Sequence, residues 1–187
     1  YYNKSKIVYC PNTCEPIYYP ISGSRIDRKK YNIPDGFIIM FTGNIGYAQA
    51  LKTIIRAALI LANNQKIKWV FVGDGSLLPW FKNQITLNKL ENSIYCLGSF
   101  PLSDMPLLIA QANVCLATLN KNPIFSLTIP SKIQSYMACG KPILASIDGE
   151  VSKIITKANC GIATSSEDPE KLADAVLRLS LLDKKNL

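Results

Sequence analysis

The stretch LTIPSKIQSYMACGKPILASIDGE, which runs from Leu127 to Glu150, contains a helix, a tight turn, a buried strand and the start of another helix. Pro130 and Ser131 predict the helix start, because proline suits the first turn and a serine hydroxyl can bond to free backbone N–H groups there. Gly140 and Pro142 predict its end. The apolar run ILASI that follows is typical of a buried strand, and it closes at an Asp-Gly pair where the next helix begins.

The same alternation of apolar strands and amphipathic helices runs outward from this stretch in both directions. It begins at Phe37 with the strand FIIMFTG, and the next segment carries a helical stripe that includes Leu51, Ile54 and Ala58. Further strands are predicted at 69–72, 93–97, 114–119, 143–147 and 161–164, and further helices at 77–88, 103–111, 151–157 and from 169 onward. Ser103 is the expected N-cap of the helix at 103–111, and residues 120–128 are expected to form a loop.

Strands that are apolar throughout, each followed by a helix, are typical of a parallel sheet with helices on both faces. Six such units indicate an α/β fold, with a doubly wound, Rossmann-like, six-stranded parallel sheet. Residues 1–35 lack a long periodic pattern, apart from a short strand expected at Ile7–Tyr9, and are predicted to connect one domain to the next. The α/β domain is predicted to span residues 36–183.

The composition is that of a globular chain with an excess of basic residues. Lysine and arginine total 21 against 13 acidic residues, which gives a formal charge of +8. One basic cluster spans Arg25–Lys30 and another is Lys184–Lys185, but the other charges are scattered, which is typical of solvated helix faces. No apolar run is long enough to cross a membrane. Because the chain begins at Tyr1 rather than at methionine, we expect that a segment upstream of it has been cut away.

The six cysteines are predicted to be reduced. Four lie within or at the ends of apolar segments, which is the pattern of buried thiols: Cys96, Cys115, Cys139 and Cys160. Cys10 and Cys14 form the single close pair, and without any histidine in the chain no zinc site is expected. The expected setting is therefore the cytoplasm. The lack of histidine also excludes Ser–His and Cys–His nucleophile systems.

Ligands of doubly wound sheets bind outside the carboxyl ends of the strands, so the loops at that edge are the places to search. The loop after the first strand contains Gly43 and Gly46, which let a ligand approach the backbone closely. The run Gly73-Asp74-Gly75 makes a similar turn after the second strand. Neither loop has the G-x-G-x-x-G pattern of a dinucleotide site. Each alone fits a plain turn as well, but together they favour a nucleotide-type ligand.

Lys132 is the strongest candidate for a ligand contact. A cation in the first turn of a helix opposes the helix dipole unless an anion lies between them, so its position favours a phosphate contact over an ordinary solvated lysine. Ser131 and Ser135 share a helix face, with Gln134 beside it. These groups suit the recognition of hydroxyls, and they suit ordinary polar helix positions equally well.

Catalytic groups are nearly absent from the chain. Asp148 and Glu150 are close in sequence, but carboxylates at a helix start are usually caps, so no pair of catalytic carboxylates is predicted. We therefore assign no catalytic residue and no metal site, and we expect the other half of an active site to lie elsewhere.

An ordered series of segments resembles the C-terminal half of a family 4, GT-B fold glycosyltransferase: FTGNIG, AQALKTIIRAA, FVGDGS, YCLGSFPLSDMPLLIAQANVCLATL and IPSKIQSYMACGKPILAS. The resemblance covers about residues 5–182, and it is strongest to the bacterial branch that builds surface polysaccharides and O-antigens, including fucosamine-transferase-like members. It implies a domain that binds a nucleotide-sugar donor, usually a UDP-sugar, and a transfer that retains anomeric configuration and needs no metal or other cofactor. The acceptor, a glycan or a polyprenyl-linked saccharide, and the catalytic residues would belong to an N-terminal domain that this chain lacks.

The resemblance also assigns positions within the site. Where many members have an arginine and then a lysine for the diphosphate, this chain has Asn44 and Gln49, and a Glu-x7-Glu pair is replaced by Leu127 and Ser135. The resemblance therefore implies that Lys132, its neighbouring N–H groups and the Gly43–Gly46 amides bind phosphate, and that Ser135 or Gln134 binds the ribose. The donor-binding candidates are Gly43, Asn44, Gly46, Gln49, Gly73, Asp74, Gly75, Ser99, Phe100, Pro130, Ser131, Lys132, Gln134, Ser135 and Glu150, with Ser99 and Phe100 at the positions that flank the nucleobase.

Three other interpretations stay open at this point. A nucleotide-sugar epimerase of GT-B architecture would need acid–base residues that the chain does not offer. A non-catalytic basic module would bind a polyanion, but no interleaving of aromatic and basic residues supports this, and no nucleic-acid partner is expected. A transferase domain that has lost its chemistry is the third. We expect a cytoplasmic protein, whose Arg25–Lys30 cluster would help the full-length enzyme to contact the inner membrane face.

Overall fold

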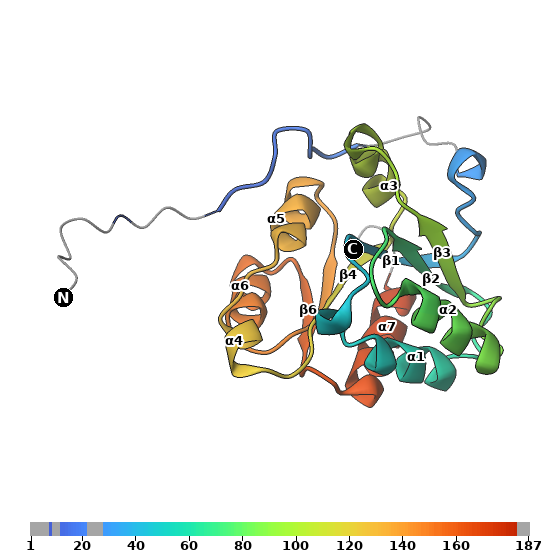
Figure 1. Cartoon of the computed structure of the whole chain (residues 1–187). Helices are drawn as coiled ribbons and strands as arrows, with labels where there is room; N and C mark the ends of the chain where they lie inside the picture. The colour runs from blue at the N-terminus through green and yellow to red at the C-terminus, as the bar shows by residue number, and fades with distance from the viewer. Residues whose placement is uncertain (1–7, 9–11, 22–27, 183–187) are drawn as a thin grey trace.

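Parallel strands form the centre of the molecule, in the order β3-β2-β1-β4-β5-β6 (Figure 1). The strands are β1 (Phe37–Thr42), β2 (Ile67–Val72), β3 (Ile94–Gly98), β4 (Val114–Thr118), β5 (Ile143–Ser146) and β6 (Gly161–Thr164). The computed structural model describes residue 8, residues 12–21 and residues 28–182. The doubly wound, Rossmann-like, six-stranded parallel sheet that the sequence predicts is confirmed.

Helices follow the strands and cover the sheet. The α-helices are α1 (Leu51–Ile60), α2 (Leu78–Leu87), α3 (Met105–Ala110), α4 (Pro123–Ser126), α5 (Ser131–Ala138), α6 (Glu150–Ala158) and α7 (Pro169–Leu181). Short 3-10 turns are η2 (Lys29–Tyr31), η3 (Tyr47–Gln49) and η4 (Leu102–Asp104). None of these helices within the described residues is long and apolar enough to cross a membrane.

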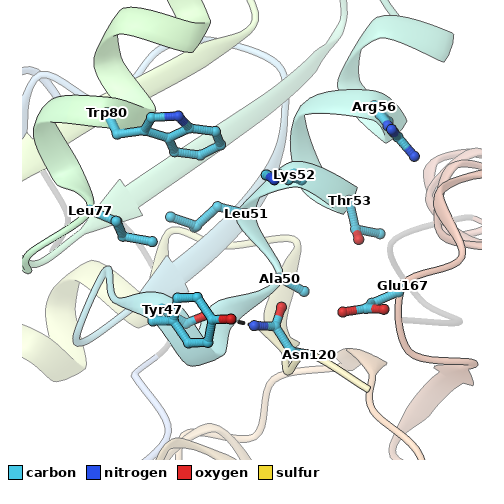
Figure 2. A pocket seen from close by; sticks show the side chains of 10 residues that line it. All are labelled: Tyr47, Ala50, Leu51, Lys52, Thr53, Arg56, Leu77, Trp80, Asn120 and Glu167. Carbon is cyan, nitrogen blue, oxygen red and sulfur yellow. Dashed lines mark hydrogen bonds between the residues drawn. The ribbon is translucent and has the colours of Figure 1, made fainter. Parts of the chain in front are cut away.

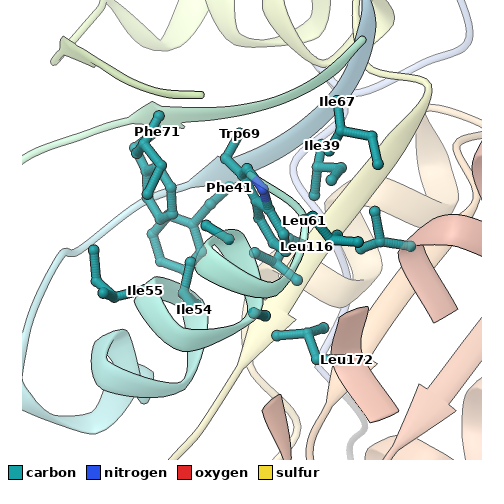
Figure 3. Close-up of a cluster of buried hydrophobic side chains, with 14 of the residues drawn as sticks. Ile39, Phe41, Ile54, Ile55, Leu61, Ile67, Trp69, Phe71, Leu116 and Leu172 are labelled. Carbon is teal, nitrogen blue, oxygen red and sulfur yellow. The ribbon is translucent and has the colours of Figure 1, made fainter. Parts of the chain in front are cut away.

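The two faces of the sheet carry separate apolar cores, because successive strand residues point to opposite sides. On one face, Ile39 and Phe41 of β1 pack with the fully buried Phe71 and with residues of α1 and α7 (Figure 3). The fully buried Phe81 of α2 belongs to the same core. The rings of Phe71 and Phe81 meet edge to face, with centroids 4.7 Å apart. The other core contains the side chains of α3, α5 and α6, opposite the alternate residues of the same strands. Continuous burial of the strands explains why they are apolar along their whole length.

The chain reverses its direction of travel across the sheet between β3 and β4. Strands β1, β2 and β3 are laid down toward one edge, and β4 then returns to pair with the other side of β1, through Ile39↔Val114 and Met40↔Cys115. In such sheets the loops after the two central strands diverge and leave a crevice at the carboxyl edge. The fold therefore predicts a binding site at the carboxyl edge of the sheet, beside the end of β1.

Helix α5 ends just before Gly140 and Pro142, as the sequence predicts. Gly140 adopts a φ of +64°, and its N–H donates to the carbonyl of Met137, while the N–H of Lys141 donates to that of Tyr136. This pair of bonds is a Schellman motif, in which glycine supplies the left-handed residue at no steric cost. Pro142 then leads directly into β5.

Two local predictions are wrong. Ser103 is not a helix N-cap, because it lies inside η4; α3 begins only after Asp104, and no side chain caps it. The segment 120–128 is not wholly a loop, because it contains α4, whose N-cap Asn122 accepts a hydrogen bond from the N–H of Ile124 at 2.8 Å. In both places a proline near the helix start moved the boundary, since proline favours the first turn.

The cysteines differ in burial according to their strands. Cys115 and Cys139 are buried as predicted, but the prediction of buried thiols is wrong for Cys96 and Cys160, which are partly exposed. Cys96 lies in β3 and Cys160 just before β6, and these are the two edge strands of the sheet, which have an uncovered side. All the cysteines that the structure describes are free thiols.

Several predictions concern residues that the structure does not describe or that join the core unexpectedly. Part of the expected strand at Ile7–Tyr9 lies outside the described residues, and Val8, its one described residue, is not in a strand. The described residues also do not include Cys10, Arg25, Lys184 and Lys185. Within the expected connector 1–35, Tyr31 and Ile33 are buried in the core on the α5 face.

Candidate functional site

A cavity of about 450 Å³ opens at the carboxyl edge of the sheet, where β1 and β2 end and α5 begins. We call it the switch-point cavity. It is lined by Glu15, Tyr18, Thr42, Gly43, Asn44, Gln49, Val72, Gly73, Ser99, Phe100, Met105, Ser131, Lys132 and Ser135. The fold thus brings most of the predicted donor-binding residues to one place, as expected for the crevice of a doubly wound sheet.

Lys132 is the one cation among the described residues that line this cavity. Its Nζ lies 3.6 Å from the centroid of the buried Phe41 ring, and it donates a hydrogen bond of 3.3 Å to Oε1 of Gln49. The residue as a whole is partly buried, and desolvation of its ammonium lowers the pKa of Lys132 from 10.5 to about 7. A negative ligand would restore the full charge, so this position favours an anion.

The start of α5 adds backbone donors beside this ammonium. Pro130 is the N-cap, with extended backbone angles, and the first turn has no acidic residue and no side-chain cap. The serine capping suggested by the sequence is therefore wrong: Pro130 holds the N-cap position, and the Ser131 side chain lines the cavity instead. Uncapped N–H groups and the positive end of the helix dipole make this a site at which phosphate is stabilised.

Tyr136 fixes α5 against the sheet. Its hydroxyl accepts a hydrogen bond of 2.9 Å from the N–H of Thr42, lies 3.1 Å from the Thr42 hydroxyl, and donates to the carbonyl of Leu116 at 3.4 Å. Complete burial raises the pKa of Tyr136, so the hydroxyl keeps its proton. These bonds join the helix that carries Lys132 to the end of β1 and to the middle of β4.

The glycine loops after β1 and β2 pack against each other. A Cβ at Gly73 would lie 2.0 Å from the carbonyl oxygen of Gly43, and one at Gly75 would lie 2.4 Å from that of Ile45. A Cβ at Gly43 would meet only Lys132, with Nζ at 3.7 Å. Gly73 and Gly75 therefore let the two loops meet, whereas Gly43 keeps the space in front of the ammonium open.

Hydrogen bonds between these loops use some of the amides that were expected to hold phosphate. The N–H of Gly43 donates to the carbonyl of Val72 at 2.8 Å, and the N–H of Ile45 donates to that of Asp74 at 2.7 Å. Among the described residues this leaves the N–H groups of Asn44 and Gly46 as the unpaired donors of the loop. The expected amide cradle is therefore smaller than four consecutive residues.

Ser99 and Phe100 line the cavity from the loop after β3. The Phe100 ring meets Tyr31 edge to face, with centroids 5.5 Å apart, and packs on the core of the α5 face. It therefore forms a rigid apolar wall, while Ser99 is exposed beside it.

Ser135 is buried, and its hydroxyl already has a partner. It donates to the carbonyl of Ser131 at 3.3 Å. Gln134 does not line the cavity, and its side-chain amide donates to the carbonyl of Asn12. Of the two residues expected to bind ribose, Ser135 is thus the one that the structure places at the cavity.

Glu15 and Tyr18 are cavity residues that the sequence pattern did not indicate. Both come from the segment 12–21, which runs past α5 (Figure 1). Glu15 is the single carboxylate among the described lining residues. No periodic pattern marks this segment, so nothing local placed it at the site; an acid between two proline-rich stretches was the only available sign.

The remaining candidates lie outside the lining of this cavity: Gly46, Asp74, Gly75, Pro130, Gln134 and Glu150. Asp74 accepts a hydrogen bond from the N–H of Gly75, which stabilises its own turn. Glu150 lies in the first turn of α6 and pairs with Lys153 at 2.7 Å. These contacts are structural and leave the cavity with a single cation and a single carboxylate among the residues that the structure describes.

Residues 36–181 match the model of the family described as glycosyl transferases group 1. The chain belongs to this family. A relative from Pseudomonas aeruginosa, named "Probable glycosyltransferase WbjE", is 32% identical to it over 97% of this chain. That alignment covers 46% of WbjE, so this glycosyltransferase domain spans less than half of that relative.

Solved glycosyltransferases share the fold of this domain. The C-terminal domain of the group 1 glycosyl transferase LpcC from Francisella tularensis superposes with a TM-score of 0.69 at 15% identity, covering 94% of each chain. HepE from Anabaena, solved with UDP and glucose, gives a TM-score of 0.68 at 19% identity over 85% of this chain and 42% of HepE. The expected C-terminal half of a GT-B glycosyltransferase is thereby confirmed, and the bacterial branch stays a prediction.

Proposed function

We propose that this chain is the donor-binding domain of a retaining glycosyltransferase that transfers a sugar from a UDP-sugar to a glycan or lipid-linked acceptor in surface polysaccharide synthesis. The observation that carries the proposal is Lys132, a desolvated ammonium beside the uncapped start of α5, in the switch-point cavity of a group 1 glycosyltransferase. Support for a UDP-linked donor comes from HepE, which shares the fold and was solved with UDP and glucose.

In this proposal the domain acts by binding and charge stabilisation. Lys132 and the N–H groups at the start of α5 bind the diphosphate and stabilise the negative charge that develops on it as the sugar leaves. Phe100 and Ser99 flank the base, and the hydroxyls of the ribose lie toward Ser135 and Glu15. The nucleotide sugar is a substrate, and no resident cofactor is invoked.

The reacting end of the acceptor and the groups that act on it are assigned to the part of a full-length enzyme that corresponds to the remainder of WbjE. The chain covers 46% of that protein. The transfer is proposed to take place on the cytoplasmic side of the inner membrane, where a lipid-linked acceptor would be reached. This domain alone is accordingly expected to bind the donor without transferring the sugar.

Calorimetric titration of the domain with UDP, GDP and ADP tests the proposal. We expect UDP to bind most tightly, and the variant Lys132→Ala to weaken UDP binding by about tenfold or more, since a hydrogen bond to a charged group contributes about 1.5–3 kcal/mol. Lys82→Ala, at an exposed site on α2 outside the cavity, is the matched control. Equal UDP affinity of the wild type and Lys132→Ala would refute the assignment.

A further inference from the structure

A second cavity, of about 500 Å³, lies around the start of α1 (Figure 2). We call it the α1 cavity. Figure 2 shows that α1 contributes Lys52 and Arg56, that Trp80 comes from α2 and Tyr47 from η3, and that Asn120 and Glu167 close the opposite side. None of these side chains lines the switch-point cavity.

Among the described residues, no acidic side chain forms an ion pair with the cationic wall of this cavity, and Glu167 is the one carboxylate in its lining. Lys52 and Arg56 are exposed, stand one helical turn apart on α1, and form no ion pair among the described residues. The sequence of α1, LKTIIRAALI, contains no acid, and its N-cap Ala50 offers no side-chain cap. Two like charges at this spacing repel each other, and Lys52 also opposes the helix dipole. A bound anion would relieve both effects.

The other walls suit a ring with hydroxyl groups. Tyr47 has 81% of its surface exposed, although it is a large aromatic residue, and Trp80 is partly buried, with Leu77 beside it. Aromatic faces beside a few polar groups are typical of small-molecule sites. Asn120 and Glu167 supply an amide and a carboxylate, which can bond to hydroxyl groups.

One short turn separates this cavity from the switch-point cavity. Within η3, Tyr47 lines the α1 cavity and Gln49 lines the switch-point cavity. The backbone of this turn is held firmly: the Asn120 side-chain amide donates to the Tyr47 carbonyl, and the Thr118 hydroxyl donates to that of Gln49, both at 2.6 Å. A ligand in the α1 cavity would therefore lie next to a donor, across a rigid wall.

We propose that the α1 cavity binds an anionic saccharide, one that carries a carboxylate or a phosphate, as a unit of the acceptor or growing glycan. The anion lies between Lys52 and Arg56, and the sugar ring lies against Tyr47 and Trp80. The assignment of this sugar to the acceptor rests on the proposed donor function of the neighbouring cavity, whereas the binding of an anionic saccharide does not.

Trp80 fluorescence provides the test, because the other tryptophan, Trp69, is 1% exposed and reports on the core. The chain is titrated with glucuronate, glucose 1-phosphate, glucose and inorganic phosphate. At least one of the two anionic sugars is expected to bind about tenfold more tightly than glucose and inorganic phosphate. The sugar that binds more tightly shows whether the cavity prefers a carboxylate or a phosphate. Equal binding of inorganic phosphate would overturn the proposal in favour of unspecific attraction to two cations.

Variants at exposed positions separate the parts of the site. The double variant Lys52→Gln/Arg56→Gln is expected to lose about tenfold or more in affinity for the anionic sugar, and Tyr47→Ala to weaken sugar binding without changing phosphate binding. Lys82→Gln is the control. Retained sugar affinity in the double variant overturns the proposal. UDP affinity, measured on the same samples, is expected to be unchanged in these variants. If the wild type does not bind UDP, the proposed donor function fails. The saccharide titration still decides whether the α1 cavity binds an anionic sugar.

Discussion

Lys132 combines the two properties that a ligand-linked charge needs, a buried ammonium and an open approach. The loss of solvent around this ammonium, which lies over the Phe41 ring, lowers its pKa to about 7, so near neutral pH the lysine is partly uncharged in the free domain. A diphosphate beside the ammonium raises the pKa again, because negative charge stabilises the protonated form. Binding of the proposed donor is therefore linked to the uptake of a proton wherever the free lysine is neutral.

This linkage predicts a pH dependence of donor binding. With UDP-glucose as the probe, the affinity is expected to be nearly constant below about pH 6 and to fall as the pH rises above about 7, by at most about tenfold per pH unit. Calorimetry between about pH 5.5 and about pH 9, in buffers of different ionisation enthalpy, measures both the affinity and the proton uptake. Lys132→Arg, which stays charged throughout this range, is the control.

A flat profile in the wild type would contradict the lowered pKa, and the same slope in Lys132→Arg would assign the titration to another group. Either outcome would still leave the Lys132→Ala experiment to decide whether this residue binds the diphosphate.

Glu15 is the second residue whose chemistry can be tested alone. It is the one carboxylate among the described lining residues of the switch-point cavity, and carboxylates recognise the ribose hydroxyls in many nucleotide sites. Glu15→Gln keeps the size and removes the charge, and we expect it to weaken UDP binding by about three- to tenfold. Binding of 2′,3′-dideoxy-UDP should then be equal in the wild type and the variant.

Glu91→Gln, on the exposed turn before β3 and outside the cavity, is the matched control for Glu15→Gln. A loss of affinity for the dideoxy nucleotide as large as that for UDP would show that Glu15 acts on the fold of the segment 12–21 rather than on the ribose.

The elements of the fold were more predictable than the contacts between them. Strands such as β1 and β4 are buried on both faces and are therefore apolar throughout, so the sequence alone locates them. The short α4 has four residues, too few for a periodic pattern, and its existence was missed, whereas the edge strand β6 was predicted at its observed bounds. The position of the segment 12–21 depends on packing against α5, which no local sequence pattern encodes. Lys132, by contrast, could be found because its conflict with the helix dipole is a local property.

Because the loops after β1 and β2 pack against each other, substitution by alanine should lower the stability by different amounts at Gly73 and at Gly98. Gly98 has a φ of +81°, and a Cβ placed there would have nothing within 4 Å, so Gly98→Ala should cost about 1–2 kcal/mol from the backbone alone. Gly73 has a φ of +140°, and its Cβ would overlap the Gly43 carbonyl at 2.0 Å. Gly73→Ala should therefore cost more than about 3 kcal/mol and weaken UDP binding. Urea denaturation of both variants measures the difference, and equal costs would mean that the loops can separate freely.

At the scale of the whole molecule, the switch-point cavity depends on residues from both apolar cores. Phe41, beneath Lys132, belongs to the core covered by α1, α2 and α7, whereas Tyr136, which anchors α5, belongs to the opposite core. The walls come from the segment 12–21, three strand ends and α5, which are far apart in the sequence. A ligand that needs all of these segments in place binds the folded state and not the unfolded chain.

The proposed donor should therefore stabilise the entire domain. At a UDP concentration of about 100 times Kd, the free energy of unfolding rises by about 2.7 kcal/mol. For a domain of this size each kcal/mol shifts Tm by about 2–4 °C, so an increase of roughly 5–11 °C is expected. Thermal unfolding followed by far-UV circular dichroism and by fluorescence of the buried Trp69 should give the same shift, because both cores unfold together. ADP at equal concentration and Lys132→Ala with UDP should give much smaller shifts. Shifts that differ between the two probes would show that UDP stabilises only part of the structure, and that the two cores are not coupled through the cavity.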